Sequence, residues 1–235
     1  MTGVQTCALP ILAKPGEDWT ATLRRWVDGS GCDALAFHFL SQEPLAYAAL
    51  WNRHLRWDPL GYDSAIERWL DYLGELGIES IAWGAVMLRK RRAERNWFAS
   101  YPTSMATLDE AGHHVERMIA AHDRLDAAAN GDLLGDRFRL ADDHRLDQSV
   151  VLHDRGGSVQ RAVLRLDGGF NFQVDLSRDA FQLLSQLDGR TLGEVLADLA
   201  AKLDGADEDE LRAQALPTVK GLLELGFLVR AEEPA

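Results

Sequence analysis

The spacing of hydrophobic residues changes along the chain and predicts two folding units of different character. In residues 12–101, apolar residues form helical stripes that alternate with short continuous apolar runs. From Gln148 the alternation follows a period of two, and helical spacing returns from residue 178. Periods of about 3.6 and 2 are the main sequence signals for helix and strand. We therefore expect an α/β unit first and a small α+β unit second.

The first unit is expected to contain three helices and three strands. In chain order they are helix, strand, helix, helix, strand and strand, over residues 19–27, 32–40, 44–51, 63–77, 78–88 and 96–101. The run 32–40 is mostly apolar, which favours a strand buried on both faces, as in a parallel sheet. The last strand is expected to return antiparallel to the one before it. A doubly wound sheet should open with a strand and a Gly-rich turn, so this order is typical of the second half of such a sheet.

The second unit is expected to begin with an amphipathic helix over residues 108–129. A hairpin follows, whose two strands flank the turn sequence 154–158. The remaining elements are a strand at 170–176, helices at 178–187, 191–203 and 207–225, and an edge strand at 227–229. Thr191 and Glu194 form a capping box, and Pro217 is expected to interrupt the last helix. Strands followed by three short helices and an edge strand predict a winged helix.

Residues 1–11, MTGVQTCALPI, differ in style from everything that follows. They carry no charge and show no helical or strand period. The string resembles the translation of a common sequencing adapter, so we exclude it from the fold as a non-native leader. The expected organisation is therefore a leader (1–11), the second half of a doubly wound sheet (12–101), a helical connector (102–147) and a winged-helix domain (148–235).

Charge and aromatic content support this division. The chain has a formal net charge of −12, of which residues 14–103 contribute only −1. All seven tryptophans and four tyrosines lie between Trp19 and Tyr101. No apolar run is long enough to cross a membrane and no signal peptide is evident, so we expect a cytoplasmic protein without a membrane partner.

The first unit resembles a known family. GEDWTATLRRWVDGSGCDALAFHFLSQEP, YAALW and YDSAIERWLDYLGELGIESIAWGAVMLRKR are similar to the last strands of bacterial class I S-adenosylmethionine-dependent methyltransferases. These relate to the enzymes that methylate release-factor glutamines. The resemblance covers about residues 15–101 and implies a Rossmann-like α/β sheet with an antiparallel hairpin at its edge. It also implies an S-adenosylmethionine cofactor and a protein or RNA substrate for the intact parent enzyme.

The motifs that would bind the methyl donor are absent from this sequence. There is no G-x-G-x-G turn and no Pro-Pro pair, so an Asn-Pro-Pro-Tyr turn is lacking too. We therefore expect no cofactor binding and no catalysis by this chain alone, and assign no catalytic residue. His38 and Phe39 end the first strand, where open α/β sheets bind ligands, and are candidates to line the substrate pocket. The alternative is that they pack a core.

The second unit also resembles a known family. DAFQLLSQLDGRTLGEVLADLAAKL and LPTVKGLLELGFL are similar to the small winged-helix peptide-binding proteins of the PqqD type. This keeps open the alternative that the chain is a non-enzymatic peptide- or protein-binding module. A transcriptional regulator is a third reading. Residues 207–225 contain five acidic and two basic residues, so we expect no DNA binding by this helix.

Two further clusters of polar residues have simpler interpretations. His113, His114 and His122 lack the i,i+4 partners of a zinc site, so no metal is expected and they are placed on a solvated helix face. The basic run Arg89–Arg92 is interpreted as a solvated strand end rather than a phosphate site.

Overall fold

The computed structural model divides the chain into two compact units, Met1–Met105 and Ala106–Ala235. It describes residues 4–13, 18–103, 111–128, 133–153, 156–187, 189–202 and 207–231, with the backbone alone for residues 4–13 and 153. Both units mix helices and strands, which confirms a general α/β class. Among the described helices, none is long and apolar enough to span a membrane.

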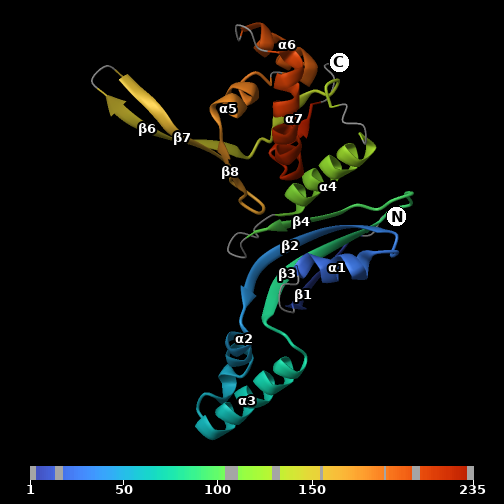
Figure 1. Cartoon of the computed structure of the whole chain (residues 1–235), viewed down its shortest axis with the longest axis vertical. Coiled ribbons are helices and arrows are strands. Elements are labelled where there is room, and N and C mark those ends of the chain that lie inside the picture. Colours follow the sequence, from blue (N-terminus) through green and yellow to red (C-terminus); the bar gives the residue numbers. More distant parts are fainter. Residues whose placement is uncertain are drawn as a thin grey trace. The chain divides into compact units, whose positions relative to one another are not determined.

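A four-stranded sheet forms the centre of the first unit (Figure 1). Its order is β1 (Val4–Ala13), β3 (Ser80–Lys90), β2 (Cys32–Gln42) and β4 (Phe98–Pro102). β3 pairs antiparallel with β1 and with β2, whereas β2 and β4 are parallel. Residues 33–37 of β2 are buried, as the apolar run predicts for a central strand.

The expected hairpin between the last two strands is wrong. β4 does not pair with β3 but lies on the other side of β2, where Ala34 pairs with Phe98 and His38 with Pro102. The backbone N–H of Ala34 donates to the carbonyl of Trp97, so the loop before β4 already lies beside β2. Hydrophobic alternation identifies a strand but not its neighbour, and the neighbour here is set by contacts between residues distant in sequence.

The leader excluded from the fold has a place in the sheet. Val4–Ala13 pairs along β3, from Val4 opposite Arg89 to Ala13 opposite Ser80. Val4–Ile11, which the prediction of the fold leaves out as part of a non-native leader, therefore pairs within the sheet. An unpaired sheet edge presents a row of N–H and C=O groups that any uncharged extended segment can satisfy. A native segment and a translated adapter could both pair in this way, so the non-native origin of residues 1–11 stays a prediction.

Three α-helices accompany this sheet. α1 (Trp19–Val27) covers one face through Leu23, which packs against residues of β2 and β3. α2 (Pro44–Trp51) and α3 (Pro59–Glu75) follow β2, joined by the short 3-10 helix η1 (Arg53–Leu55). Figure 1 shows α2 and α3 beyond one end of the strands.

The start of α3 differs from the expectation. The sequence pattern predicts a helix break at residues 58–61 and a helix that begins at Asp63 or Ser64. The structure begins it at Pro59, with the side chain of Asp58 accepting from the backbone N–H of Gly61. Proline fits the first helical position because its missing N–H would be unpaired there anyway.

The described residues of the second unit form a three-stranded antiparallel sheet, a two-stranded sheet and four helices. They comprise α4 (Ala111–Ala127), β5 (Phe138–Leu140), β6 (His144–His153), β7 (Gly156–Leu166), β8 (Gln173–Leu176), α5 (Arg178–Leu184), α6 (Leu192–Lys202), α7 (Glu208–Glu224) and β9 (Leu228–Arg230). The sheets have the orders β6-β7-β8 and β5-β9. The predicted hairpin is confirmed as β6 and β7, which project from the helices of this unit (Figure 1).

The sequence makes one prediction for each of the last two helices, a capping box at the start of α6 and an interruption of α7 at Pro217. The capping box is confirmed, since the Thr191 N–H donates to Glu194 Oε2 and the Glu194 N–H donates to Thr191 Oγ1. The interruption at Pro217 is wrong, because α7 runs unbroken through it. Burial of Ala215, Val219 and Leu222 along one side of α7 holds the helix together despite the missing N–H.

Candidate functional site

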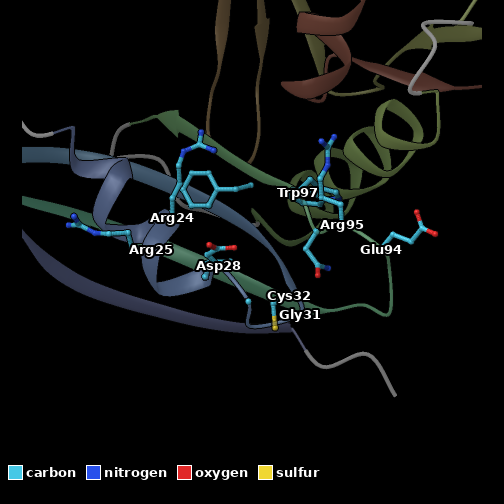
Figure 2. A pocket seen from close by; sticks show the side chains of 12 residues that line it. Arg24, Arg25, Asp28, Gly31, Cys32, Glu94, Arg95 and Trp97 are labelled. Atoms are coloured by element: carbon cyan, nitrogen blue, oxygen red, sulfur yellow. The ribbon is translucent and has the colours of Figure 1, made fainter.

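The candidate site is a pocket of about 550 Å³ at the end of the first unit's sheet where β2 begins. Its walls come from the last turn of α1, the turn before β2 and the loop between β3 and β4. Figure 2 shows Arg24 and Arg95 extending in the same direction from α1 and from that loop. Trp97 and Phe98 supply aromatic surface, and Asp28 is the acidic group of α1 that lines the pocket.

The two arginines of α1 have local reasons to be where they are. They lie in the last turn of the helix, where positive charge offsets the negative end of the helix dipole. The Arg24 guanidinium carbon lies 4.3 Å from the centre of the Phe98 ring, a cation–π contact with β4. Arg25 donates from Nη2 to Thr22 Oγ1 at 2.9 Å. Both side chains remain exposed to solvent.

A buried carboxylate next to the pocket organises the loop between β3 and β4. Asp33, the second residue of β2, is 1% exposed. Its Oδ2 accepts from Arg89 Nη2 at 2.7 Å and forms an ion pair with Arg91 Nε at 2.7 Å. Its Oδ1 accepts from Asn96 Nδ2 at 3.0 Å and from the backbone N–H of Trp97 at 3.2 Å. The loop from residue 91 to 97 is thereby tied to β2.

The same contacts determine the charge of this carboxylate. Burial by itself raises the pKa of Asp33, but hydrogen bonds from Arg89, Asn96, Arg91 and the Trp97 N–H outweigh it and lower the pKa below its ordinary value. Asp33 is therefore ionised at neutral pH.

The interpretation of Arg89–Arg92 as a solvated strand end is wrong for two of the four residues. The side chains of Arg89 and Arg91 are 16% and 26% exposed and point to Asp33. Lys90 instead donates to the carbonyl of Ser30 at 2.6 Å, and Arg92 is exposed. The outcome differs from the expectation because the sequence pattern gives no sign that Asp33 faces these arginines.

His38 and Phe39, the residues predicted to line a substrate pocket, lie at an irregularity of the central strand. In the β2–β3 ladder His38 pairs with Gly84 and Leu40 pairs with Trp83, so Phe39 is the extra residue of a β-bulge. Bulges are over-represented next to functional sites because they redirect a side chain. Neither residue lines the candidate pocket described above, which is at the opposite end of β2.

The surroundings of His38 are partly apolar. Its ring centroid lies 5.1 Å from that of Trp19, and its Nε2 is 2.9 Å from Ser41 Oγ. Burial lowers the pKa of His38, so the imidazole is neutral at physiological pH and can exchange a hydrogen bond with Ser41. Both His38 and Phe39 are half-buried, so each side chain packs against the protein on one side and is accessible to a ligand on the other.

The histidines of α4 do not all lie on a solvated face, and for His114 that expectation is wrong. His114 is 2% exposed, with Nε2 donating to the Leu225 carbonyl at 2.8 Å and Nδ1 accepting from the Phe170 N–H at 3.2 Å. His113 is exposed and His122 is half-buried. Among the described residues, no group of three His, Cys, Asp or Glu side chains is arranged to hold a metal ion.

Comparison with known proteins adds one similarity. Residues 117–230 match the family model described as a domain of unknown function (DUF7782). The match runs from within α4 to the end of β9 and so lies in the second unit. A search of the curated proteins finds no match for the chain.

Proposed function

We propose that the first unit is part of a Rossmann-like sheet of the S-adenosylmethionine-dependent methyltransferase type, and that it contributes to substrate contact rather than to methyl-donor binding. The observation that carries this proposal is the bulge at His38 and Phe39, near the carboxyl end of the central strand. Open α/β sheets bind their ligands outside the carboxyl ends of the strands.

The sheet's strand directions support the same proposal. β2 and β4 are parallel, and β3 is antiparallel beside them. Doubly wound folds often carry an antiparallel strand near the edge of an otherwise parallel sheet. Such a sheet is built from further parallel strands, and the open edge of β4 is where they would pair.

The surface of α2 supports an additional covering segment. Its sequence, PLAYAALW, has no polar face, yet Leu45, Leu50 and Trp51 are exposed. A helix that is apolar all round is normally buried on all sides. In the proposal, the rest of the methyltransferase domain covers this helix.

The residues present do not fit the methyl donor itself. The left-handed glycines nearest the sheet, Gly29 and Gly31, precede β2 instead of following a strand. A phosphate- or nucleotide-type turn must lie at the carboxyl end of a strand for the backbone to approach the ligand. No step of methyl transfer is therefore assigned to this chain's residues.

Titration calorimetry of the purified chain with S-adenosylmethionine tests the proposal directly. We expect no heat of binding, and clear micromolar binding would contradict it. Sequencing the genomic DNA upstream of codon 12 is the second test. An open frame that encodes a Gly-rich turn and an Asn-Pro-Pro-Tyr turn supports the methyltransferase, whereas a stop codon or an unrelated frame counts against it.

A second function, peptide binding by a PqqD-like winged helix, is favoured by the β6–β7 hairpin. Val150, Leu152 and Val159 are exposed on it, at 50%, 82% and 53%. β6 is also an edge of its three-stranded sheet, and an extended peptide can add to such an edge as a further strand. Amide spectra of the labelled chain, recorded with a panel of extended apolar peptides, test this: shifts along β6 support it, and unchanged spectra contradict it.

A further inference from the structure

The basic residues of the first unit are concentrated around one pocket. Residues 14–103 hold eleven Lys and Arg and twelve Asp and Glu. Seven of the eleven basic residues, but only three of the twelve acidic ones, fall in residues 24–33 and 89–95, which gives this region a net charge of +4. The seven are Arg24, Arg25, Arg89, Lys90, Arg91, Arg92 and Arg95. Of these, Arg24, Arg25 and Arg95 line the pocket itself, together with the acidic Asp28 and Glu94, and we call this cavity the basic pocket.

The tertiary structure, not the sequence, brings these charges together. Arg24 and Arg25 end α1, whereas Arg95 lies in the β3–β4 loop, about seventy residues later. The loop is held against β2 by Asp33, through Asn96 and the Trp97 N–H. Asp33 is buried, and its negative charge is paired with Arg89 and Arg91 instead of facing the pocket. The exposed side chains of Arg24, Arg25 and Arg95 line the opening.

The chemistry of the lining suits a phosphate diester with a base attached. Arginine presents several N–H donors in a planar fork that matches the oxygens of a phosphate. Trp97 and Phe98 line the same pocket, and each ring has a guanidinium over one face, Arg89 on Trp97 at 5.7 Å and Arg24 on Phe98 at 4.3 Å. A base would stack on the opposite face of Trp97. The pocket's volume, about 550 Å³, has room for a single nucleotide unit. Positive charge together with aromatic platforms is the combination found in proteins that bind single-stranded nucleic acid.

The overall negative charge does not oppose this assignment. Of the net −12, residues 104–235 account for −11. At an ionic strength of 0.15 M charges are screened beyond about 8 Å, so binding depends on the local charge rather than on the total. The acidic Asp28 and Glu94 at the pocket would repel phosphate, but their carboxylates can accept hydrogen bonds from sugar hydroxyls or base amines.

We propose that the basic pocket binds single-stranded nucleic acid, with the backbone phosphate held by Arg24 and Arg95 and a base stacked on Trp97. This proposal rests on the geometry of the first unit and does not require the chain to be part of a methyltransferase.

Fluorescence anisotropy of the full chain with a labelled single-stranded ten-nucleotide RNA, and with the DNA of the same sequence, tests the proposal. Binding in the micromolar range at low salt is expected, with affinity falling as salt rises because counterions are released. The double variant Arg24→Glu/Arg95→Glu should weaken binding by about tenfold or more. It should also reduce the slope of log affinity against log salt concentration by about two. A preference for RNA or for DNA then identifies the natural strand.

Matched variants make the test specific. The control double variant Arg53→Glu/Arg56→Glu makes the same change in charge within the same unit, but at the other end of β2. It should change the affinity by no more than about twofold, because only the net charge of the unit is altered. Trp97→Leu should weaken binding by a factor on the order of ten, and Trp97→Phe should restore most of it because a ring face remains. Near-unchanged circular dichroism verifies that each variant is folded.

Three results would overturn the proposal. They are no binding of either oligonucleotide at low salt, equal weakening by the pocket and control double variants, and binding of an acidic peptide in place of both strands. None of them bears on the calorimetric test with S-adenosylmethionine, so failure here is distinguishable from failure of the proposed function.

Discussion

At the scale of single residues, Asp33 ties separate segments of the first unit together. Its carboxylate contacts four residues, namely Arg89 of β3 and Arg91, Asn96 and the Trp97 N–H of the loop that follows β3. Removing one partner of a buried ion pair leaves the other charge without compensation, which costs more than the pair contributes. The geometry of the basic pocket therefore depends on a residue that does not line it.

Asp33→Asn tests this dependence. The uncharged amide cannot balance Arg89 and Arg91, so we expect a loss on the order of 3 kcal/mol in the free energy of unfolding, measured by urea denaturation. Asp28→Asn, an exposed carboxylate in the same pocket, serves as the control and should change stability by less than about 0.5 kcal/mol. Equal effects of the two substitutions would contradict the role assigned to Asp33.

His114 and His122 make the second unit sensitive to pH. Burial lowers the pKa of His114, and a hydrogen bond to the Leu225 carbonyl and the charge of Asp143 only partly oppose it. Burial likewise lowers the pKa of His122 from 6.5 to about 4, with Asp123 opposing. A protonated His114 would also lose the bond that its Nδ1 accepts from Phe170.

The sign of the pH effect follows from these directions. Between pH 6.5 and about 4 the unfolded chain binds a proton at His122 that the folded chain does not, and the lowered pKa of His114 acts in the same direction below pH 6.5. Stability is therefore full above pH 6.5 and falls as the pH decreases, by a total on the order of 3 kcal/mol for His122. Chemical denaturation at a series of pH values measures it. The double variant His114→Gln/His122→Gln should flatten the curve in this window, and an unchanged slope would contradict the assignment.

At the scale of elements, the β2–β3 pair depends on a glycine opposite the bulge. A Cβ atom at Gly84 would lie 2.2 Å from the Phe37 carbonyl oxygen, which is backbone and cannot move without opening the ladder. Gly84 pairs with His38, next to the extra residue Phe39. The close approach of the two strands at this point therefore requires glycine.

Two glycine substitutions distinguish the steric requirement for Gly84 from the general effect of replacing glycine by alanine. Gly84→Ala should destabilise the chain by about 2 kcal/mol or more, because the added methyl group clashes with backbone. Gly74→Ala, inside α3 with open space around it, should stabilise by about 0.5 to 1 kcal/mol. Thermal unfolding followed by circular dichroism gives both values. A neutral Gly84→Ala would show that the bulge tolerates a side chain.

At the scale of the whole molecule, the boundary between the two units determines which pieces of the chain can fold. The structure assigns α4 to the second unit, where Val115, Met118 and His114 are buried, rather than to a separate connector. His114 links α4 to the end of α7 and to the loop before β8. The segment 148–235, which the sequence predicts to be a winged-helix domain, would by itself lack all of these contacts, and β5 as well.

Expression of two fragments tests the boundary. Residues 106–235 should fold cooperatively, whereas residues 148–235 lose buried apolar side chains worth on the order of 5 kcal/mol, comparable with the stability of a small domain. Well-dispersed amide spectra for the first and collapsed spectra for the second are expected. Equal dispersion of both spectra would show that α4 is dispensable.

What the sequence determines by itself is the set of local elements and their ends. α1 and α2 match their predicted ranges, the capping box forms as expected, and Gly77 and Gly226 end their helices with positive φ. Each of these features depends on residues within a few positions of one another, and a linear pattern records such relations. The β6–β7 hairpin belongs to the same class, because its turn joins strands adjacent in the sequence.

Only the tertiary structure decides which elements are neighbours and which polar residues are buried together. β4 pairs with β2 instead of β3, Val4–Ala13 occupies a sheet edge, and α7 passes through Pro217. Asp33 meets Arg89 across 56 positions, and Arg24 shares a pocket with Arg95. Contacts of this kind form through packing and charge compensation between segments that are distant in the sequence. The residues on either side of Asp33 therefore do not identify the arginines with which it pairs.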